Sequence, residues 1–135
     1  MIQTLQLCEN GTSLQLCEDG TSLMRCADDC ADCDETYTAT VDSGGSPGGV
    51  HCAEAYGIPV TIARTSGCAW SGFAISGDYR IEVSVWKDPV LGWIKEWWVK
   101  DAVTLAPWCS GRCYKASSVC PPGAFSGGNS AGTVA

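Results

Sequence analysis

The sequence of 135 residues has few basic side chains, one histidine and no long apolar run. Its eight Lys and Arg residues are scattered singly among fifteen Asp and Glu, and the formal charge is −7. Without a basic patch we expect no binding to nucleic acid, and the same charge disfavours an anionic membrane surface. No stretch approaches the run of about 18 apolar residues that marks a membrane span. The sequence therefore predicts neither kind of partner.

Catalytic and signal motifs are also missing. The first residues, MIQTLQLCENG, lack the basic and apolar regions of a secretory signal, so we expect synthesis in a cytosol. No GxSxG occurs, and the only histidine, His51, adjoins Cys52, where neighbouring side chains of an extended segment point apart. Paired carboxylates remain open because Asp and Glu are plentiful. We predict no enzyme and no cofactor, and we assign no catalytic, cofactor-binding or metal-binding residue.

Ten cysteines are present, which is far more than core packing requires. They include two triplets: Cys26, Cys30 and Cys33, and Cys109, Cys113 and Cys120. Only Cys30 and Cys33 have the tight CxxC spacing of a zinc knuckle. Disulfides are therefore favoured, while a zinc site and packed reduced thiols remain open. Disulfides in a chain made in a cytosol are expected if it leaves the cell inside a particle released by lysis, or if a signal is absent from this sequence.

A nine-residue motif is repeated near the start of the sequence, in TLQLCENGTSLQLCEDGTSLMRC, residues 4–26. Asn10-Gly11 and Asp19-Gly20 are typical of two-residue hairpin turns, and that register places five leucines on one face of a three-stranded meander. A parallel stack of the repeats, with one leucine ladder and one cysteine ladder, is the alternative. We favour the meander. Its apolar face would need a cover from the rest of the domain or from a neighbouring molecule.

After the acidic cysteine cluster, alternating segments with turns about every ten residues predict strands. The segment Gly92–Leu105 fits a strand or a helix, and its Trp, Ile and Val content favours the strand, with Trp93 and Trp97 on one face and Trp98 on the other. We predict an all-β fold, a small sandwich or barrel preceded by the meander. The predicted parts are residues 1–26, a cysteine-rich β domain at 27–120 that ends in a stapled loop over 109–120, and a flexible Gly/Ser/Ala tail at 121–135. The other predicted strands are 36–42, 57–65, 68–75 and 79–86.

The paired Trp97 and Trp98 cannot both lie in one core if the segment is a strand. One of them is therefore expected to meet a partner or a ligand. A protein interface and a stacked sugar are the two options, and we favour the interface because Trp is enriched at such sites.

The stretch from Asp34 to Val103 resembles a type of small cysteine-rich β module found in uncharacterised proteins of bacteriophages and aquatic bacteria. The resemblance lies in TYTATVD, IPVTIART, YRIEVSVW and, most specifically, SGCAWSG at residues 66–72. The chain has PVTI where YTL is usual. The resemblance transfers no catalytic residue, and it implies a non-enzymatic building or display module, with a phage particle as one natural home.

We therefore expect a structural protein of a bacteriophage virion, made in the host cytoplasm and released by lysis. A capsid decoration or cement protein is favoured. It would form oligomers and contact copies of itself and the major capsid or tail protein. The alternatives are a tail or fibre component, a secreted carbohydrate-binding module and a zinc-binding adaptor.

Overall fold

The fold is described from a computed structural model, in which residues 30–47 and 50–135 are described. The chain divides after residue 33 into two units. The described part of the first, residues 30–33, is a turn in which the Cys33 N–H donates to the Cys30 carbonyl. All named elements belong to the second: β1 (Thr36–Gly44), α1 (Val50–Ala53), β2 (Val60–Ser66), β3 (Ala69–Ser76), β4 (Tyr79–Asp88), β5 (Gly92–Asp101), β6 (Pro107–Lys115), β7 (Gly123–Phe125) and β8 (Ser130–Val134).

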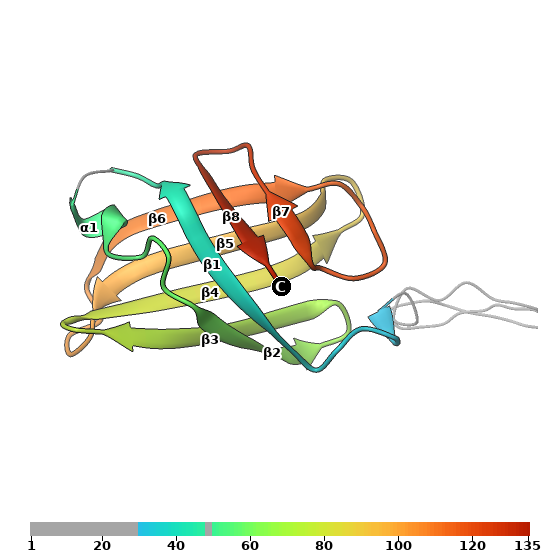
Figure 1. Cartoon of the computed structure of the whole chain (residues 1–135), viewed down its shortest axis with the longest axis horizontal. Helices are drawn as coiled ribbons and strands as arrows, with labels where there is room; N and C mark the ends of the chain where they lie inside the picture. The colour runs from blue at the N-terminus through green and yellow to red at the C-terminus, as the bar shows by residue number, and fades with distance from the viewer. Residues whose placement is uncertain (1–29, 48–49) are drawn as a thin grey trace, which may run out of the picture. The chain divides into compact units, whose positions relative to one another are not determined.

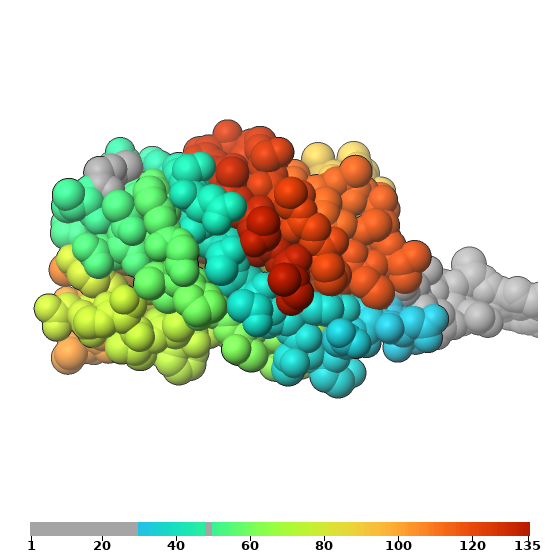
Figure 2. All heavy atoms as spheres, in the orientation of Figure 1, coloured from blue at the N-terminus to red at the C-terminus, as the bar shows by residue number. Residues whose placement is uncertain are grey.

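These eight strands form one antiparallel sheet in the order β6-β5-β4-β3-β2-β1-β8-β7. The sheet folds back on itself, so that β1, β8 and β7 cross in front of β6, β5 and β4 in Figure 1. On that face β8 lies beside β1 (Figure 2). An isolated bridge between Tyr114 and Ser126 links the two ends, but β6 and β7 share no continuous ladder. The all-β prediction is confirmed, and the sheet is not closed into a barrel.

Alternation along the strands places the core between the two halves of the folded sheet. Val83 on β4 lies opposite Trp97 on β5, and both side chains are buried. Burying such side chains is the main stabilising contribution in a domain of this size. The principal inward side chains are Ala39, Val41, Val60, Ile62, Trp70, Ile81, Val83, Val85, Trp93, Trp97, Val99 and Phe125.

The SGCAWSG segment has a structural explanation. Trp70 is buried, its indole N–H donates to the Asp34 carbonyl at 3.0 Å, and its ring packs 5.9 Å from that of Trp93. Gly72 lies so close to the backbone of Thr61 on β2 that a Cβ atom there would collide with the Thr61 carbonyl oxygen. The motif thus supplies a core anchor and a close contact between strands.

Two predictions for the C-terminal part are wrong. The stretch predicted as a stapled loop, 109–120, contains most of β6, in which Cys109 and Cys113 point inward. The predicted flexible tail, 121–135, contains β7 and β8, and its Phe125 and Val134 side chains are buried. The alternation of apolar residues that predicts a strand is missing here because glycines face bulky partners. Gly111 lies against Trp97, and Gly132 lies against Lys95.

The nine-residue repeats and the meander predicted for residues 1–26 lie outside the described residues. So do residues 27–29 and 48–49. Within the described part, no helix is long and apolar enough to cross a membrane.

Candidate functional site

The outer face of β3, β4, β5 and β6 brings aromatic and charged side chains together in register. Phe73 on β3 pairs with Glu82 on β4, and Glu82 pairs with Trp98 on β5. The next outward position on β5 is Lys100, whose partner on β4 is Arg80. We call this surface the outer face and define it by Phe73, Arg80, Glu82, Trp86, Glu96, Trp98, Lys100 and Arg112.

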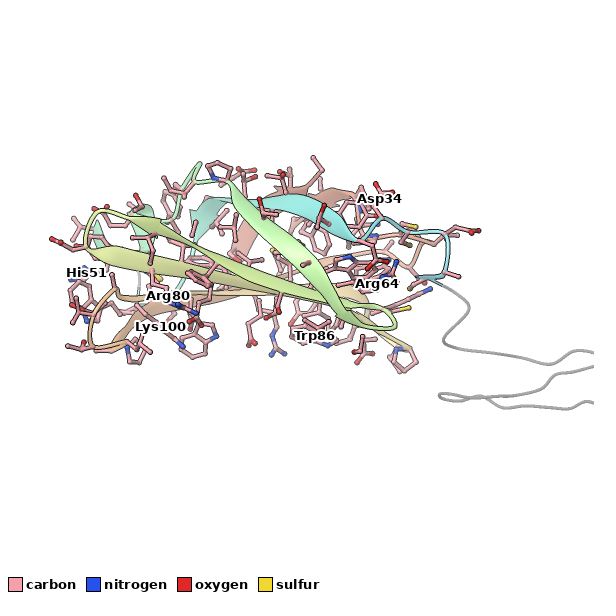
Figure 3. The ribbon with its side chains drawn as sticks, turned by 90° about the horizontal axis from the view of Figure 1, so that it is seen from below. Asp34, His51, Arg64, Arg80, Trp86 and Lys100 are labelled. Carbon is pink, nitrogen blue, oxygen red and sulfur yellow. A yellow bond between two sulfur atoms is a disulfide. The ribbon has the colours of Figure 1, made fainter. Side chains whose placement is uncertain are left out.

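Glu82 is the electrostatic centre of the outer face. Its carboxylate accepts hydrogen bonds from Arg80 Nε at 2.6 Å and from Lys100 Nζ at 2.9 Å. Partial burial would raise the pKa of Glu82, but the hydrogen bonds and charges of Lys100 and Arg80 outweigh it and lower that pKa. Figure 3 shows Arg80 and Lys100 side by side along the sheet. The carboxylate therefore stays ionised and fixes both cations.

Both cations also lie over aromatic rings. The Arg80 guanidinium carbon is 3.6 Å from the centroid of Phe73, and Lys100 Nζ is 5.7 Å from that of Trp98. Such contacts are attractive because the ring face carries partial negative charge. The rings are thereby held in place while much of their surface remains accessible to solvent, 51% for Phe73 and 36% for Trp98.

A second cation cluster continues the outer face toward β6. Arg112 donates to Glu96, its cross-strand partner, at 2.8 Å, and its guanidinium carbon lies 5.5 Å from the centroid of Trp86. The hydrogen bond to Glu96 raises the pKa of Arg112. The outer face therefore repeats one arrangement, in which a cation is held between a carboxylate and an aromatic ring; Phe73 and Trp98 are exposed, whereas Trp86 is half-buried.

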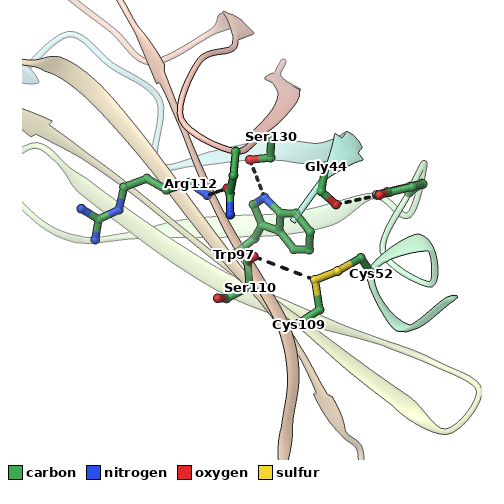
Figure 4. The surroundings of a disulfide bond; sticks show 9 residues. Gly44, Cys52, Trp97, Cys109, Ser110, Arg112 and Ser130 are labelled. Carbon is green, nitrogen blue, oxygen red and sulfur yellow. Dashed lines mark hydrogen bonds between the residues drawn. A yellow bond between two sulfur atoms is a disulfide. The ribbon is translucent and has the colours of Figure 1, made fainter. Parts of the chain in front are cut away.

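The prediction that Trp97 and Trp98 face opposite sides is confirmed. Trp97 is fully buried, and its indole N–H donates to Ser130 Oγ at 3.1 Å (Figure 4). Trp98, by contrast, lies on the outer face and is 36% exposed. Sequence reasoning placed one of the two at a partner surface but found none of the cations beside it. The alternation of β4 and β5 could have predicted these neighbours, because it places Arg80, Glu82, Trp98 and Lys100 on the same side of the sheet.

His51 and Cys52 do not form a catalytic dyad. Cys52 is bonded to Cys109, with Cα atoms 5.3 Å apart, and so has no thiol in this structure. The His51 ring instead packs 4.5 Å from the centroid of Trp108, which in turn lies 5.2 Å from Tyr79. The disulfide and the aromatic cluster together attach α1 to β6.

The interior holds a pair that sequence reasoning missed. Lys95 on β5 is fully buried, and its Nζ donates to the Thr40 carbonyl on β1. Its direct cross-strand partner is Cys113 on β6, which is buried and is the one free cysteine among the described residues. Burial lowers the pKa of Lys95 and raises that of Cys113, although each group's charge opposes the other's shift. Both groups therefore tend toward their neutral forms.

The cysteine triplets are not brought together as free thiols. The disulfide-bonded cysteines are Cys30, Cys33, Cys52, Cys68, Cys109 and Cys120, while Cys26 lies outside the described residues. In the part of the chain that is described, no group of three or more His, Cys, Asp or Glu side chains is arranged to hold a metal ion. The described cysteines thus follow the disulfide interpretation, with Cys113 as the exception.

Comparison of the chain with protein-family models, with curated proteins and with solved structures gives no match in any of the three.

Proposed function

We propose that the chain is a non-enzymatic structural protein of a bacteriophage particle, a decoration or cement protein of the capsid. It docks on the major capsid protein through the outer face of β3 to β6. The observation that carries this proposal is the composition of that face, because Trp and Arg are the residues most enriched among the energetic centres of protein interfaces. Three such cation-aromatic contacts lie on one face of four adjacent strands.

A protein partner fits this face better than a sugar. Stacking of a sugar requires an open ring face, and the Phe73 ring is covered on one side by Arg80. The carboxylates already bind the cations, so a partner gains mainly by covering the aromatic surface and excluding water from the ion pairs. The disulfide between Cys52 and Cys109 supports the same proposal, because a protein displayed outside the cell benefits from covalent stabilisation.

The first test locates the chain in a lysate of infected cells. The chain should band with DNA-filled particles in a density gradient, and quantitative mass spectrometry should find a copy number close to that of the major capsid protein. Recovery only in the particle-free fraction would contradict a virion protein. A copy number of a few per particle would instead favour a tail or fibre component.

The second test addresses the outer face. Capsids lacking the chain should bind the wild-type protein and should lose at least tenfold in affinity for Trp98→Ala, a change of about 1.4 kcal/mol or more. Val90→Ala is the matched control, because Val90 is 88% exposed in the turn between β4 and β5, away from the outer face. Equal binding by both variants would rule out docking through this face. Quenching of tryptophan fluorescence by glycans, with no capsid binding, would favour a carbohydrate-binding module.

A further inference from the structure

Two chemically unusual groups face each other inside the sheet. Lys95 is the one charged or polar residue classed as buried among those described, and it is completely inaccessible to solvent. Cys113 is equally inaccessible and keeps a free thiol, although six other described cysteines are disulfide-bonded. Burying an amine or a thiol with few polar partners costs free energy, so the coincidence of the two at one place calls for an explanation.

Register brings the two side chains together. Lys95 and Cys113 are direct partners in the antiparallel pair of β5 and β6, and both project to the inner face. Directly opposed residues have Cβ atoms about 4.5–5.5 Å apart, which is within reach of a bent lysine side chain. The Lys95 amine is further confined by Gly132 and by its hydrogen bond to Thr40 on β1. Ser130, on β8, hydrogen-bonds the Cys113 sulfur.

Among the residues that the structure describes, no other cysteine is free to form a disulfide with Cys113. The nearest cysteine along β6, Cys109, is already bonded to Cys52. The group that faces the sulfur across the strands is an amine, which burial drives toward its neutral and therefore nucleophilic form. When the Cys113 thiol is oxidised inside the fold, the neighbouring group that can react with its sulfur is therefore the Lys95 amine.

We propose that Lys95 Nζ and Cys113 Sγ are joined through a single oxygen atom, in an N–O–S bridge formed with dioxygen. The amine loses one N–H hydrogen and the thiol loses its S–H hydrogen, while an N–O bond and an S–O bond form. The O–O bond breaks, one oxygen atom stays in the bridge, and the other leaves as water with the two hydrogens. The four electrons removed from nitrogen and sulfur reduce the dioxygen. Excess dithiol reduces the bridge: two dithiol molecules supply four electrons and four hydrogens, are oxidised to disulfides, and release the amine, the thiol and water.

The bridge would join β5 to β6, the strand at one end of the sheet. It would also remove one N–H and one S–H hydrogen from the interior. The inference is independent of the proposed function, because it depends only on the interior pair.

The test compares intact masses of the full chain purified in air, measured unfolded and without reductant. We expect the wild type to be heavier by one oxygen atom and lighter by two hydrogen atoms than the form with disulfides alone. Dithiol treatment should remove the added oxygen and make Cys113 reactive to a thiol reagent. Proteolysis without reductant should give one cross-linked peptide containing both residues, with no tryptic cleavage after Lys95.

Two variants test the assignment. Lys95→Met and Cys113→Ser should each lose the added oxygen, whereas Lys100→Met, which alters a half-buried lysine on the outer side of the same strand, should keep it. Full reaction of Cys113 with the thiol reagent before reduction would overturn the proposal. So would an added oxygen that persists in Lys95→Met, because it would be a sulfenic acid on Cys113 alone. If a variant fails to fold, the wild-type mass and peptide map still decide between the outcomes.

Discussion

The indole of Trp97 lies over the backbone of Gly111, its cross-strand partner on β6, so closely that a Cβ atom at Gly111 would come within 2.5 Å of the ring. The indole N–H donates to Ser130 Oγ, and both the ring and the Cys52–Cys109 disulfide approach Gly45. This contact sets how near β6 lies to the core.

Gly111→Ala should therefore destabilise the domain. The added methyl group must displace the Trp97 ring, and overpacking of this kind costs about 1–3 kcal/mol. Chemical denaturation monitored by tryptophan fluorescence measures the loss. Gly77→Asn is the control, because nothing lies within 4 Å of its Cβ position and asparagine tolerates the φ of 60° there. Equal stability of Gly111→Ala and wild type would mean that the ring is not in tight contact.

Removing the Cys52–Cys109 disulfide should have a larger effect. The bond closes a loop over a sequence separation of 57 residues. Restricting the unfolded chain in this way stabilises the folded state by about 4 kcal/mol in the loop-entropy model. The double variant Cys52→Ala with Cys109→Ala should lower the free energy of unfolding by a comparable amount in urea titration. A loss below about 1 kcal/mol would indicate strain in the native bond that offsets its benefit.

The alternation of β4 could be predicted from the sequence, because large apolar residues occupy every second position, and Trp93, Trp97 and Val99 follow the same period on β5. The same alternation places Lys95 between Trp93 and Trp97 on the inner face. A pattern of apolar residues does not include a lysine, so it does not predict that Lys95 is buried, although Lys95 occupies an inward position of that pattern. Its pairing with Cys113 required knowledge that the segment predicted as a loop is β6.

The strands β7 and β8 could not be predicted in this way. Gly132 has no side chain because the Lys95 amine and the Thr40 carbonyl occupy that space. A small residue that complements a bulky one on a distant strand gives no periodic signal of its own. The pairing of Cys52 with Cys109 is inaccessible for a similar reason, since spacing alone does not determine connectivity.

Glu82→Gln should remove part of the pH dependence of stability. Because its cation partners lower the pKa of Glu82 in the folded state, the unfolded chain takes up the proton first as the pH falls. The contribution of Glu82 to the free energy of unfolding is complete above the unfolded pKa of about 4.3. It is lost as the pH falls toward the lower pKa of Glu82 in the folded state. The unfolding temperatures of the wild type and Glu82→Gln, measured from pH 7 to about 3, should therefore converge at the acidic end.

The exposed Glu54 supplies the control for that series. The unfolding temperature of Glu54→Gln should differ from that of the wild type by the same amount across the whole pH range. If the unfolding temperatures of the wild type and Glu82→Gln differ by a constant amount down to about pH 3, the ion pairs with Arg80 and Lys100 do not form in solution.

The two phenylalanines of the chain provide a direct test of the C-terminal strands. Phe125 on β7 is 1% exposed, whereas Phe73 on the outer face is 51% exposed. If β7 and β8 belong to the core, Phe125→Ala should cost roughly 3–5 kcal/mol, as removal of a buried aromatic ring does. Phe73→Ala should cost about 1 kcal/mol or less, the value of its exposed contact with Arg80. Chemical denaturation of both variants measures the two losses. A flexible tail would give the opposite order, because Phe125→Ala would then leave the unfolding midpoint unchanged while Phe73→Ala still lost its contact with Arg80.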